Sequence, residues 1–459
     1  MRPAGILAGV AALVALAAPV PLMALTVRVA AGADAAAAVA AAAAGDTVQL
    51  ARGIHAGPLR IERAIVLRGA PGAVVDGGGR GTVIEIVAPG TIVEDLTVRG
   101  SGGRIMTIDS GIHVVLGHGT EIRRVRFEDV LYGIYCERAH GVHIEDCSLR
   151  GRVTPRAERG EGNGVHLWYS DDVHVTGTSV ERFLDGIYLS FANRTVVAHC
   201  RMSDNGRYGL HTMYCQQNLL RGNLFTRNVA GCAIMFSNRL RIENNDVIEN
   251  RGSRTYGFLL RDCSDGTFTG NRMVDNTIAM FMDNSNRNQV AQNLFQDNGW
   301  GLLMFSSCSD NEVAGNNFIN NDYPVALDMR RTNNRFDDGA LGNYWSENAP
   351  YDLDGDTVSD VPYSPVGAFA FLSKQYPDLA ILSKSPAVAA LGVAERIVPA
   401  LRPSEAVDRF PRIEPVEVSG VGRVAGAPAP VTPGWLALGA FGLLALLGLG
   451  GLRHGWRVR

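Results

Sequence analysis

The sequence predicts an all-β protein that folds as a right-handed parallel β-helix, a solenoid of about 13 coils. Three observations support this class: a unit of 22 to 23 residues recurs, apolar residues alternate within each unit, and asparagines fall at the same two places from unit to unit. Of the 459 residues, 53 are glycine and 7% are aromatic, which favours one sheet-rich body with many turns.

The repeat is clearest between residues 111 and 323. The first and third positions after the opening glycine are mostly apolar, as in Ile187 and Leu189, which is the alternation of a strand. We expect these positions to face the interior and the second and fourth positions to face outward. The units begin at Gly111, Gly133, Gly164, Gly186, Gly209, Gly231, Gly257, Ala279 and Gly301.

Asparagines recur at two places in the later units and favour stacked turns. Asparagine tolerates a left-handed backbone, and amides stacked from coil to coil can bond one another in a ladder. We therefore expect two asparagine ladders. They consist of Asn223, Asn245, Asn271, Asn293 and Asn316, and of Asn228, Asn250, Asn276, Asn298 and Asn321.

Both ends of a solenoid need covers, because an open coil exposes strand edges and apolar interior. The stretch ADAAAAVAAAAAGDTVQL predicts a helical cap at the N-terminal end, and GNYWSENAPYDLDGDTVSDVPY (residues 342–363) begins where the last coil stops. We assign residues 25–364 to the capped β-helix and residues 365–432 to a linker rich in alanine and proline.

Both termini indicate an extracytoplasmic protein. Residues 1–24 have the charged start, apolar middle and small-residue end of a signal peptide. Residues 433–459 form an apolar tail with a basic flank, RHGWRVR, which is just long enough for a transmembrane helix. The body is therefore expected in the periplasm, associated with the cytoplasmic membrane or anchored in it by this tail.

Charge and cysteine usage exclude several classes. A net charge of −3 without a basic cluster argues against a nucleic-acid partner. The seven cysteines are odd in number and form no CxxC, so neither a zinc knuckle nor a thiol redox pair is indicated. We expect most of them to be packed thiols.

The opening stretch GDTVQLARGIHAGPLRIERAIVLRGAPGAVVDGGGRGTVIEI, the coil repeat and the end motif GNYWSENAPYDLDGDTVSDVPY together resemble the NosD family of periplasmic maturation proteins for nitrous-oxide reductase. The resemblance covers about residues 25 to 365, and the end motif is its most specific part. The apolar tail and its long linker depart from the family pattern.

This resemblance implies a β-helix of the carbohydrate-binding and sugar-hydrolase type that is not itself an enzyme. It implies an accessory role beside the ATPase and membrane permease of an ABC-type complex. The cargo would be copper or a sulfur species for the copper-sulfide cluster of the reductase. A copper chaperone and nitrous-oxide reductase itself are the further partners.

The end motif contains a candidate calcium site. Asp352, Asp354, Asp356 and Asp360 supply hard oxygen ligands at a spacing near that of calcium-binding loops. The pattern is not an EF-hand, because the glycine falls at the fourth position and Tyr363 replaces the bidentate glutamate. The alternative is a turn-rich cap loop held by bonds from side chains to the backbone.

A candidate copper site follows from the outward positions of the repeat. His113, Tyr135, His166, Tyr188 and His211 would form one column, and Trp168, Ser190, Met213 and Met235 a second beside it. On this register His211 lies ~6.8 Å from Met213, and Met235 lies ~4.8 Å from Met213 on the next coil. Thioethers and imidazoles favour Cu(I) over zinc or calcium, so His211, Met213, Met235 and His166 are the candidate copper ligands. The alternative is a patch of methionine and aromatic residues covered by a loop or a partner.

Three insertions support a binding face on that side of the coils. Residues 100 to 110, 150 to 163 and 250 to 256 all precede a repeat glycine and should leave the coils at one corner. Insertions along one edge of a solenoid mark its binding face. We expect them to form a cradle for a partner, with Trp168 and Tyr188 on the partner-binding face.

Two other functions compete with this one. Many β-helices bind or cleave polysaccharides, but a glycosidase needs a facing acid and base. The outward columns offer only Glu137, Asp283 and Asp328, which are several coils apart. The third alternative is a passive envelope scaffold.

Overall fold

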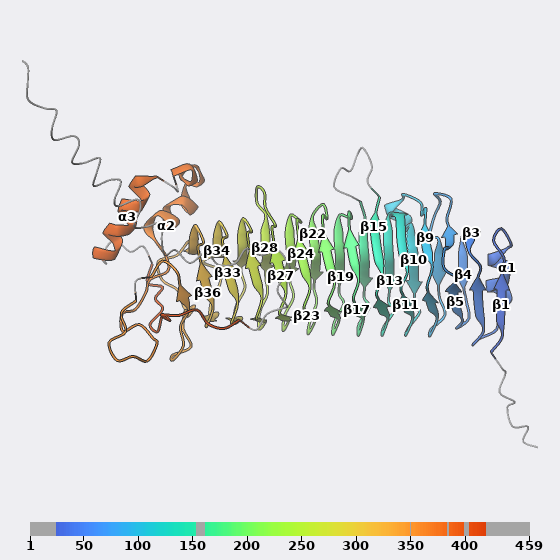
Figure 1. Cartoon of the computed structure of the whole chain (residues 1–459), viewed down its shortest axis with the longest axis horizontal. Coiled ribbons are helices and arrows are strands. Elements are labelled where there is room, and N and C mark those ends of the chain that lie inside the picture. The colour runs from blue at the N-terminus through green and yellow to red at the C-terminus, as the bar shows by residue number, and fades with distance from the viewer. Residues whose placement is uncertain (1–23, 153–160, 349, 383–384, 399–403, 419–459) are drawn as a thin grey trace, which may run out of the picture. The chain divides into compact units, whose positions relative to one another are not determined.

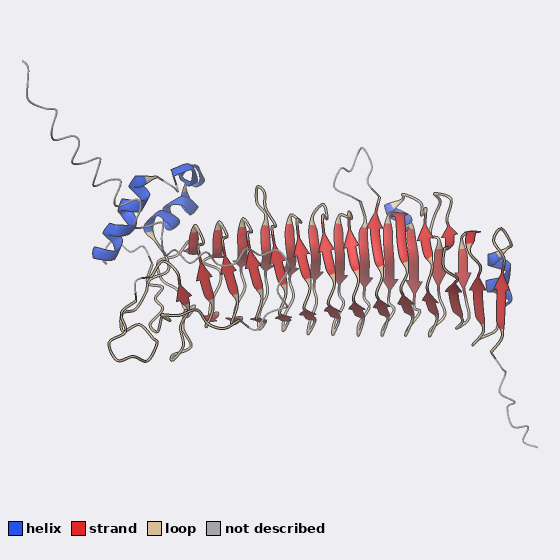
Figure 2. Ribbon diagram, in the orientation of Figure 1, coloured by secondary structure: helices blue, strands red, loops and turns tan. Residues whose placement is uncertain are grey.

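Three parallel β-sheets, which we call A, B and C, form the sides of successive coils (Figures 1 and 2). The structure, a computed structural model, describes residues 24–152, 161–348, 350–382, 385–398 and 404–418. Each coil contributes one strand to each sheet, and neighbouring strands in a sheet come from successive coils. The predicted parallel β-helix is confirmed.

Sheets A and B have 13 strands each and sheet C has 12. Sheet A contains β1 (Thr26–Val29), β2 (Thr47–Leu50), β5 (Val66–Gly69), β8 (Ile92–Glu94), β11 (Glu121–Arg123), β14 (His143–Glu145), β17 (His174–Thr176), β20 (Val196–Ala198), β23 (Leu219–Arg221), β26 (Arg241–Glu243), β29 (Thr267–Thr269), β32 (Gln289–Ala291) and β35 (Glu312–Ala314). Sheet B contains β3 (Gly53–Ala56), β6 (Ala73–Asp76), β9 (Thr97–Arg99), β12 (Arg126–Val130), β15 (Ser148–Gly151), β18 (Ser179–Glu181), β21 (Arg201–Ser203), β24 (Leu224–Thr226), β27 (Asp246–Ile248), β30 (Arg272–Val274), β33 (Leu294–Gln296), β36 (Asn317–Ile319) and β38 (Tyr344–Trp345). Sheet C contains β4 (Leu59–Ile61), β7 (Ile84–Ile86), β10 (Ser110–Val115), β13 (Tyr132–Glu137), β16 (Asn163–Trp168), β19 (Asp185–Ser190), β22 (Tyr208–Met213), β25 (Ala230–Met235), β28 (Tyr256–Arg261), β31 (Ile278–Asp283), β34 (Trp300–Met304) and β37 (Tyr323–Leu327).

The interior of the coils is one continuous apolar core. The inward residues of sheet C, such as Ile187 and Leu189, are fully buried in it, as the alternation predicted. Aromatic rings fill its last coils: Phe318 stacks on Phe295 at 4.5 Å and on Trp345 at 4.4 Å between ring centroids. The tryptophan of the end motif therefore closes the core by stacking, which gives that motif a structural role.

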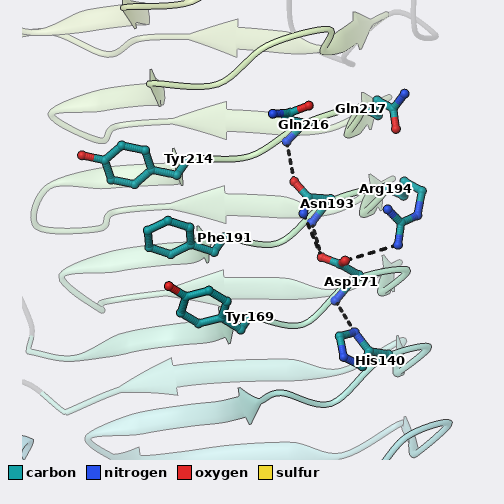
Figure 3. A pocket seen from close by; sticks show the side chains of 9 residues that line it. All are labelled: His140, Tyr169, Asp171, Phe191, Asn193, Arg194, Tyr214, Gln216 and Gln217. Atoms are coloured by element: carbon teal, nitrogen blue, oxygen red, sulfur yellow. Dashed lines mark hydrogen bonds and ion pairs between the residues drawn. The ribbon is translucent and has the colours of Figure 1, made fainter.

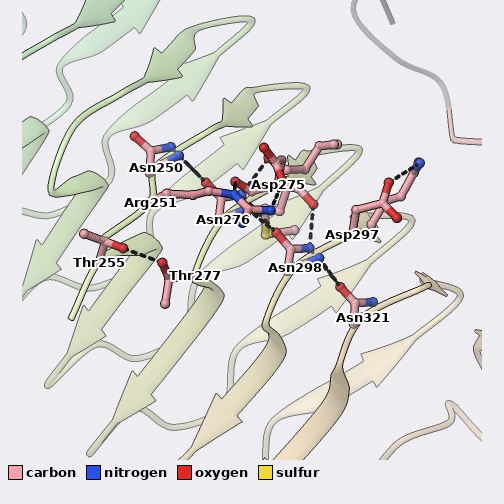
Figure 4. A network of polar contacts seen from close by, with 12 residues as sticks. Asn250, Arg251, Thr255, Asp275, Asn276, Thr277, Asp297, Asn298 and Asn321 are labelled. Atoms are coloured by element: carbon pink, nitrogen blue, oxygen red, sulfur yellow. Dashed lines mark hydrogen bonds and ion pairs between the residues drawn. The ribbon is translucent and has the colours of Figure 1, made fainter. Parts of the chain in front are cut away.

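Both predicted asparagine ladders are present, although their backbone role differs from the prediction. In the first ladder, the backbone N–H and the side-chain amide of Asn271 both donate to Oδ1 of Asn293, at 2.9 and 3.0 Å. The second ladder runs from Asn250 to Asn321 in the same way (Figure 4). The left-handed backbone conformation belongs to the preceding residue, for example Asp275 before Asn276, and not to the ladder asparagine.

The first ladder ends on a carboxylate from much later in the chain. Asn343 extends this ladder, and Oδ2 of Asp408 accepts its backbone N–H at 2.8 Å. The same oxygen accepts the Nε1–H of Trp345 at 2.8 Å, and the Asp408 side chain lies fully buried. Because a carboxylate has only acceptors, it satisfies the donors that the last asparagine would otherwise leave unpaired.

Helices occur mainly at the two ends. The predicted N-terminal cap is confirmed as α1 (Ala35–Ala41), whose first turn is capped by the side chain of Asp34. Within residues 365–432, expected as a linker, the structure has α2 (Ala368–Gln375), the 3-10 helix η2 (Pro377–Leu382) and α3 (Pro386–Ile397), and Ser404 to Arg412 contact the last coils. One further 3-10 helix, η1 (Ile105–Thr107), lies in the first insertion.

The described residues contain no helix that is both long and apolar enough to cross a bilayer. The predicted transmembrane tail, residues 433–459, lies outside the described residues, as does the predicted signal peptide except for Ala24. All seven cysteines are buried and unpaired, as expected for packed thiols. Cys308, for which the sequence suggested no place, is one of these free thiols. Its sulfur accepts the backbone N–H of Ser285 from the preceding coil at 3.4 Å.

We predict that Asp408→Ala loosens the C-terminal end of the coils. The substitution leaves the buried donors of Asn343 and Trp345 without partners, which should destabilise the last coil by about 3 kcal/mol. Hydrogen exchange should show faster exchange at Asn343 and Ser346 than in the unaltered protein. Glu405→Ala, an exposed change in the same segment, serves as the control and should leave exchange unchanged.

Candidate metal centre on the outer face of sheet C

The strand register places the predicted outward residues in two columns on the outer face of sheet C. His211 pairs with Tyr188, which pairs with His166, and Met213 pairs with Met235 on the next coil. We call this surface the wall. It comprises His113, Tyr135, His166, Tyr188 and His211 in the first column, and Glu137, Trp168, Ser190, Met213 and Met235 in the second.

Rings of the first column stack from coil to coil. The centroids of Tyr135 and His166 are 4.4 Å apart, those of His166 and Tyr188 are 4.6 Å apart, and those of Tyr188 and His211 are 4.5 Å apart. Although these residues point outward, they cover one another, and only 6% of His211 is exposed. The wall is therefore partly desolvated before any partner covers it.

His211 has the geometry of a metal ligand held by a second residue. Its Nδ1 lies 3.2 Å from Oδ2 of Asp185, so the ring donates its Nδ1 proton to this carboxylate. Among the described residues, Nε2 of His211 is one of the few buried side-chain nitrogens without a hydrogen-bond partner. A histidine that donates one ring nitrogen to a carboxylate and leaves the other unprotonated is the usual arrangement behind a bound metal.

Asp185 is itself fixed as an anion. Its side chain is fully buried, and Arg207 donates to its two oxygens at 2.8 and 2.5 Å. Burial alone would raise the pKa of Asp185, but the hydrogen bonds from Arg207 and His211 outweigh burial and hold this pKa below its usual range. The carboxylate therefore stays charged and keeps the tautomer of His211 defined.

Two thioethers occupy the column next to that of His211. Met213 and Met235 are neighbours in adjacent strands, and both side chains are only partly buried. The hydroxyl of Tyr188 donates to Sδ of Met213 at 3.4 Å, which orients that sulfur. The register thus places three of the four predicted copper ligands on two adjacent strands of the wall: His211 and Met213 on β22, and Met235 on β25.

His166 does not join the same set. The ring of Tyr188 lies between the imidazoles of His166 and His211, because each imidazole packs against one of its faces. Nδ1 of His166 lies 3.1 Å from the side-chain amide of Asn163, which donates to it and leaves the ring proton on Nε2. The prediction that His166 shares one ion with His211 is therefore corrected: two coils and an intervening ring separate them.

Sequence reasoning missed Asp185 and Arg207, which position His211. Asp185 directly precedes the repeat glycine, where the neighbouring coils have Asn163 and Tyr208, and Tyr132 stands there one coil earlier. An acid in a column otherwise rich in aromatic residues was the available signal. The alternation that separates inward from outward residues is defined for the positions after the glycine, and Asp185 stands before it.

The predicted partner-binding residues lie in an apolar layer outside the core. Tyr132, Tyr135 and Leu131 form a buried cluster on the wall, and Trp168 and Ile108 pack against it. The guanidinium of Arg138 lies 5.4 Å from the centre of the Trp168 ring. Tyr188 lies one coil beyond Trp168 and is half-buried by its two histidine neighbours.

The three insertions leave the coils at one corner, as predicted. Each connects a strand of sheet B to a strand of sheet C: β9 to β10, β15 to β16 and β27 to β28. The third insertion, which leads into β28, projects beyond the neighbouring turns in Figure 1. Residues 153–160 of the second insertion lie outside the described residues. The insertions therefore lie along one edge of the wall, at the N-terminal ends of the sheet C strands.

Three of the four predicted calcium ligands converge. Asp352, Asp354 and Asp356 each have a carboxylate oxygen within 4.8 Å of the others, and the last two are exposed. Asp360 instead accepts the backbone N–H of Leu353 at 2.7 Å. Asp352 also accepts two backbone N–H groups, at 2.7 and 3.1 Å, so the loop has the internal hydrogen bonds of a structural turn as well.

Comparisons with known proteins identify the family of this chain. The family model described as "Periplasmic copper-binding protein (NosD)" matches residues 149–349, which include Asp185, His211, Met213 and Met235. A protein of Pseudomonas aeruginosa named "Probable ABC transporter binding protein NosD" is 30% identical over 386 residues, covering 80% of this chain and 89% of that protein. The chain belongs to the NosD family. A protein of Stutzerimonas stutzeri with the same name is 27% identical over 379 residues, covering 79% of this chain and 86% of its own length.

Among solved structures, the Dettilon tailspike protein is similar in fold. It aligns with a TM-score of 0.50 at 16% identity and covers 64% of each chain. At this identity the likeness concerns the solenoid alone. The NosD chain and a phage tailspike share the coil architecture, and the wall must be judged from its own residues.

We predict that His166 makes stability depend on pH. Burial lowers the pKa of His166 to about 3, whereas an unfolded histidine titrates near 6.5. Below pH 6.5 the unfolded chain binds the proton and the folded chain does not, so stability falls as pH falls, by at most about 2 kcal/mol at pH 5. Denaturant unfolding at pH 7.5 and 5 should show a smaller loss for His166→Gln than for the unaltered protein. An equal loss in both would contradict the prediction.

Proposed function

We propose that this NosD protein is an extracytoplasmic accessory factor, without catalysis of its own, for the maturation of nitrous-oxide reductase. It works beside an ABC-type ATPase and permease and carries copper or a sulfur species for the copper-sulfide cluster. The family description as a periplasmic copper-binding protein supports the copper half of this proposal. The relatives' names as probable ABC transporter binding proteins support the partnership.

The observation that carries the proposal is the unpartnered Nε2 of His211. Its desolvation is unfavourable unless something binds it, and a buried polar atom without a partner in a native protein asks for an explanation. In the neutral ring, the hydrogen bond to Asp185 holds the proton on Nδ1 and leaves a lone pair on Nε2. A cation that accepts a nitrogen lone pair is the partner that fits.

The neighbouring ligands favour Cu(I) over harder ions. Met213 and Met235 are thioethers, which bind soft Cu(I) and hold zinc or calcium poorly. The unbranched methionine side chains are flexible enough to close on one ion from adjacent coils. His166, one ring farther along the wall, supplies a second imidazole that stays neutral at acidic pH because burial lowers its pKa. We propose that His166 is a second binding position for the copper ion, separate from the one at His211.

The apolar layer around Trp168 and Tyr188 supports a docking role for the wall. A copper chaperone or the reductase would cover this layer and bring its own ligands to Met213 and Met235. The insertions along one edge would hold the partner in register with the coils. In this proposal the periplasmic body receives copper on the wall, while the C-terminal tail keeps it at the cytoplasmic membrane beside the permease.

We predict that His211→Ala combined with Met213→Ala abolishes tight Cu(I) binding and copper-dependent activation of the reductase, with the fold retained. Asp185→Asn should weaken Cu(I) binding by about 10 to 100-fold, because the ring of His211 loses its orienting partner. Competition with a Cu(I)-specific chelator measures both. His143→Ala with His174→Ala, which removes a stacked histidine pair from the outer face of sheet A, is the matched control and should bind Cu(I) normally. Unchanged binding in the first variant would remove this site.

We further propose that Ca²⁺ orders the loop of Asp352, Asp354 and Asp356. The convergence of three carboxylates within 4.8 Å supports an oxygen-ligand site, because the repulsion between them would be relieved by a divalent cation. Calorimetry should show binding heat with Ca²⁺ that Asp354→Ala loses. Asp338→Ala, an acid in another turn near the last coil, should keep it. If the unaltered protein gives no heat, the loop is a structural turn only.

A further inference from the structure

A row of exposed aromatic rings lies on the opposite edge of the wall from the insertions, at the C-terminal ends of the sheet C strands. Tyr169, Phe191, Tyr214 and Phe236 occupy the same corner of four successive coils, directly after the strands of sheet C. Their rings stack with centroid separations of 4.6, 4.9 and 5.0 Å. Each side chain is nevertheless 36% to 45% exposed. We call this row the aromatic ladder.

The fold itself does not require aromatic residues at this corner. All four have a left-handed backbone with φ between 49° and 57°, a conformation that bulky residues rarely adopt. Other coils satisfy the same corner with Arg138, Asp262 or Asn284. The rings lie outside the core, so they add little to burial of the coils. A strained and exposed position that is aromatic four times in succession suggests a surface made for binding.

A row of polar side chains runs parallel to the aromatic ladder. The backbone N–H of Gln216 donates to Oδ1 of Asn193 at 2.9 Å, and that of Asn193 donates to Oδ1 of Asp171 at 2.8 Å. The backbone N–H of Asp171 donates to Nδ1 of His140 at 3.0 Å. These bonds fix one planar polar group per coil, as Figure 3 shows. Between the two rows lies a groove of about 420 Å³.

The groove carries little net charge. The two charged lining residues, Asp171 and Arg194, form an ion pair at 3.2 Å, and Arg194 also pairs at 2.7 Å with Asp172 outside the lining. Nδ1 of His140 accepts a hydrogen bond, which places the proton of the neutral ring on Nε2 as a donor. The polar side therefore contains both hydrogen-bond donors and acceptors. Such a surface recognises hydroxyl and amide groups better than a polyanion, which needs an excess of basic residues.

We infer that this groove binds a neutral linear glycan along the axis of the coils. Each sugar of such a chain presents a flat apolar face and a rim of hydroxyl groups, and each coil presents one aromatic ring and one planar polar group. In Figure 3 the rings of Tyr169, Phe191 and Tyr214 lie one above another beside the polar row. The coil repeat therefore matches a polymer repeat, and a chain of several sugars would engage several coils at once.

This site is separate from the proposed copper site. The copper ligands lie on the strands of sheet C, whereas the groove lies beyond them in the turns that lead to sheet A. Glycan binding would hold the protein against polysaccharide of the cell envelope and leave His211, Met213 and Met235 free. A failure of either proposal therefore leaves the other intact.

Calorimetric titration of the full chain with cellohexaose and with chitohexaose tests the inference. We expect binding of at least one of these neutral hexamers. Phe191→Ala should weaken it about fivefold to tenfold, the equivalent of one lost aromatic contact. Phe191→Tyr should bind normally because the ring remains. Leu116→Ala, at the same left-handed corner but outside the aromatic ladder, should also bind normally.

Three outcomes would overturn the inference. One is the absence of binding for both hexamers at millimolar concentration in protein whose circular dichroism spectrum shows the folded β-helix. Another is equal glycan affinity in Phe191→Ala, which would place the binding elsewhere. The third is that no neutral hexamer binds and Phe191→Ala instead abolishes a different interaction, either with an alginate oligomer or with the reductase. The groove would then recognise an anionic chain or a protein.

Discussion

The in-register stacking of successive coils is the constraint on which the rest of this structure depends. Parallel pairing fixes each strand against the strand one coil away, and the asparagine ladders repeat the same bonds inside the turns. A ladder amide satisfies two donors and one carbonyl of the preceding coil, so the buried turns leave few polar groups unpaired. A shift of one residue in one coil would break these bonds and turn its apolar residues outward.

This constraint also gathers residues that are distant in the chain. Asp185 and His211 are separated by more than one repeat, and register alone brings the carboxylate to the imidazole. The same geometry turns a column of single residues into a stack of rings, where each ring shields the next from water. A surface that is formally outside the core thereby becomes dry enough to make an unpartnered nitrogen significant. The two edges of this surface differ, with insertions on one side and the aromatic ladder on the other.

At each end of the solenoid, the last coil leaves hydrogen-bonding groups and apolar side chains without the next coil to pair with them. At the C-terminal end the ladder donors would have no acceptor, and Asp408 returns from 65 residues downstream to supply one. Phe318 and Trp345 end the core by stacking, and Ser404 to Arg412 follow the last coil. The end motif, which was the most specific part of the family resemblance, is thus explained in large part by closure of the fold. Its aspartates add a cluster of carboxylates on the exposed side of that closure.

The sequence alone determined the solenoid, its period, the inward and outward faces and both ladders, because a repeat of fixed length translates directly into neighbours in space. It also placed His211, Met213 and Met235 in adjacent outward columns, since parity and period are enough to predict that register. Only the tertiary structure decided that Tyr188 separates His166 from His211, that Asp185 and Arg207 hold the ring of His211, and that Asp408 ends the ladder. These depend on side-chain directions and on a segment without periodicity, and a pattern along the chain contains neither kind of information.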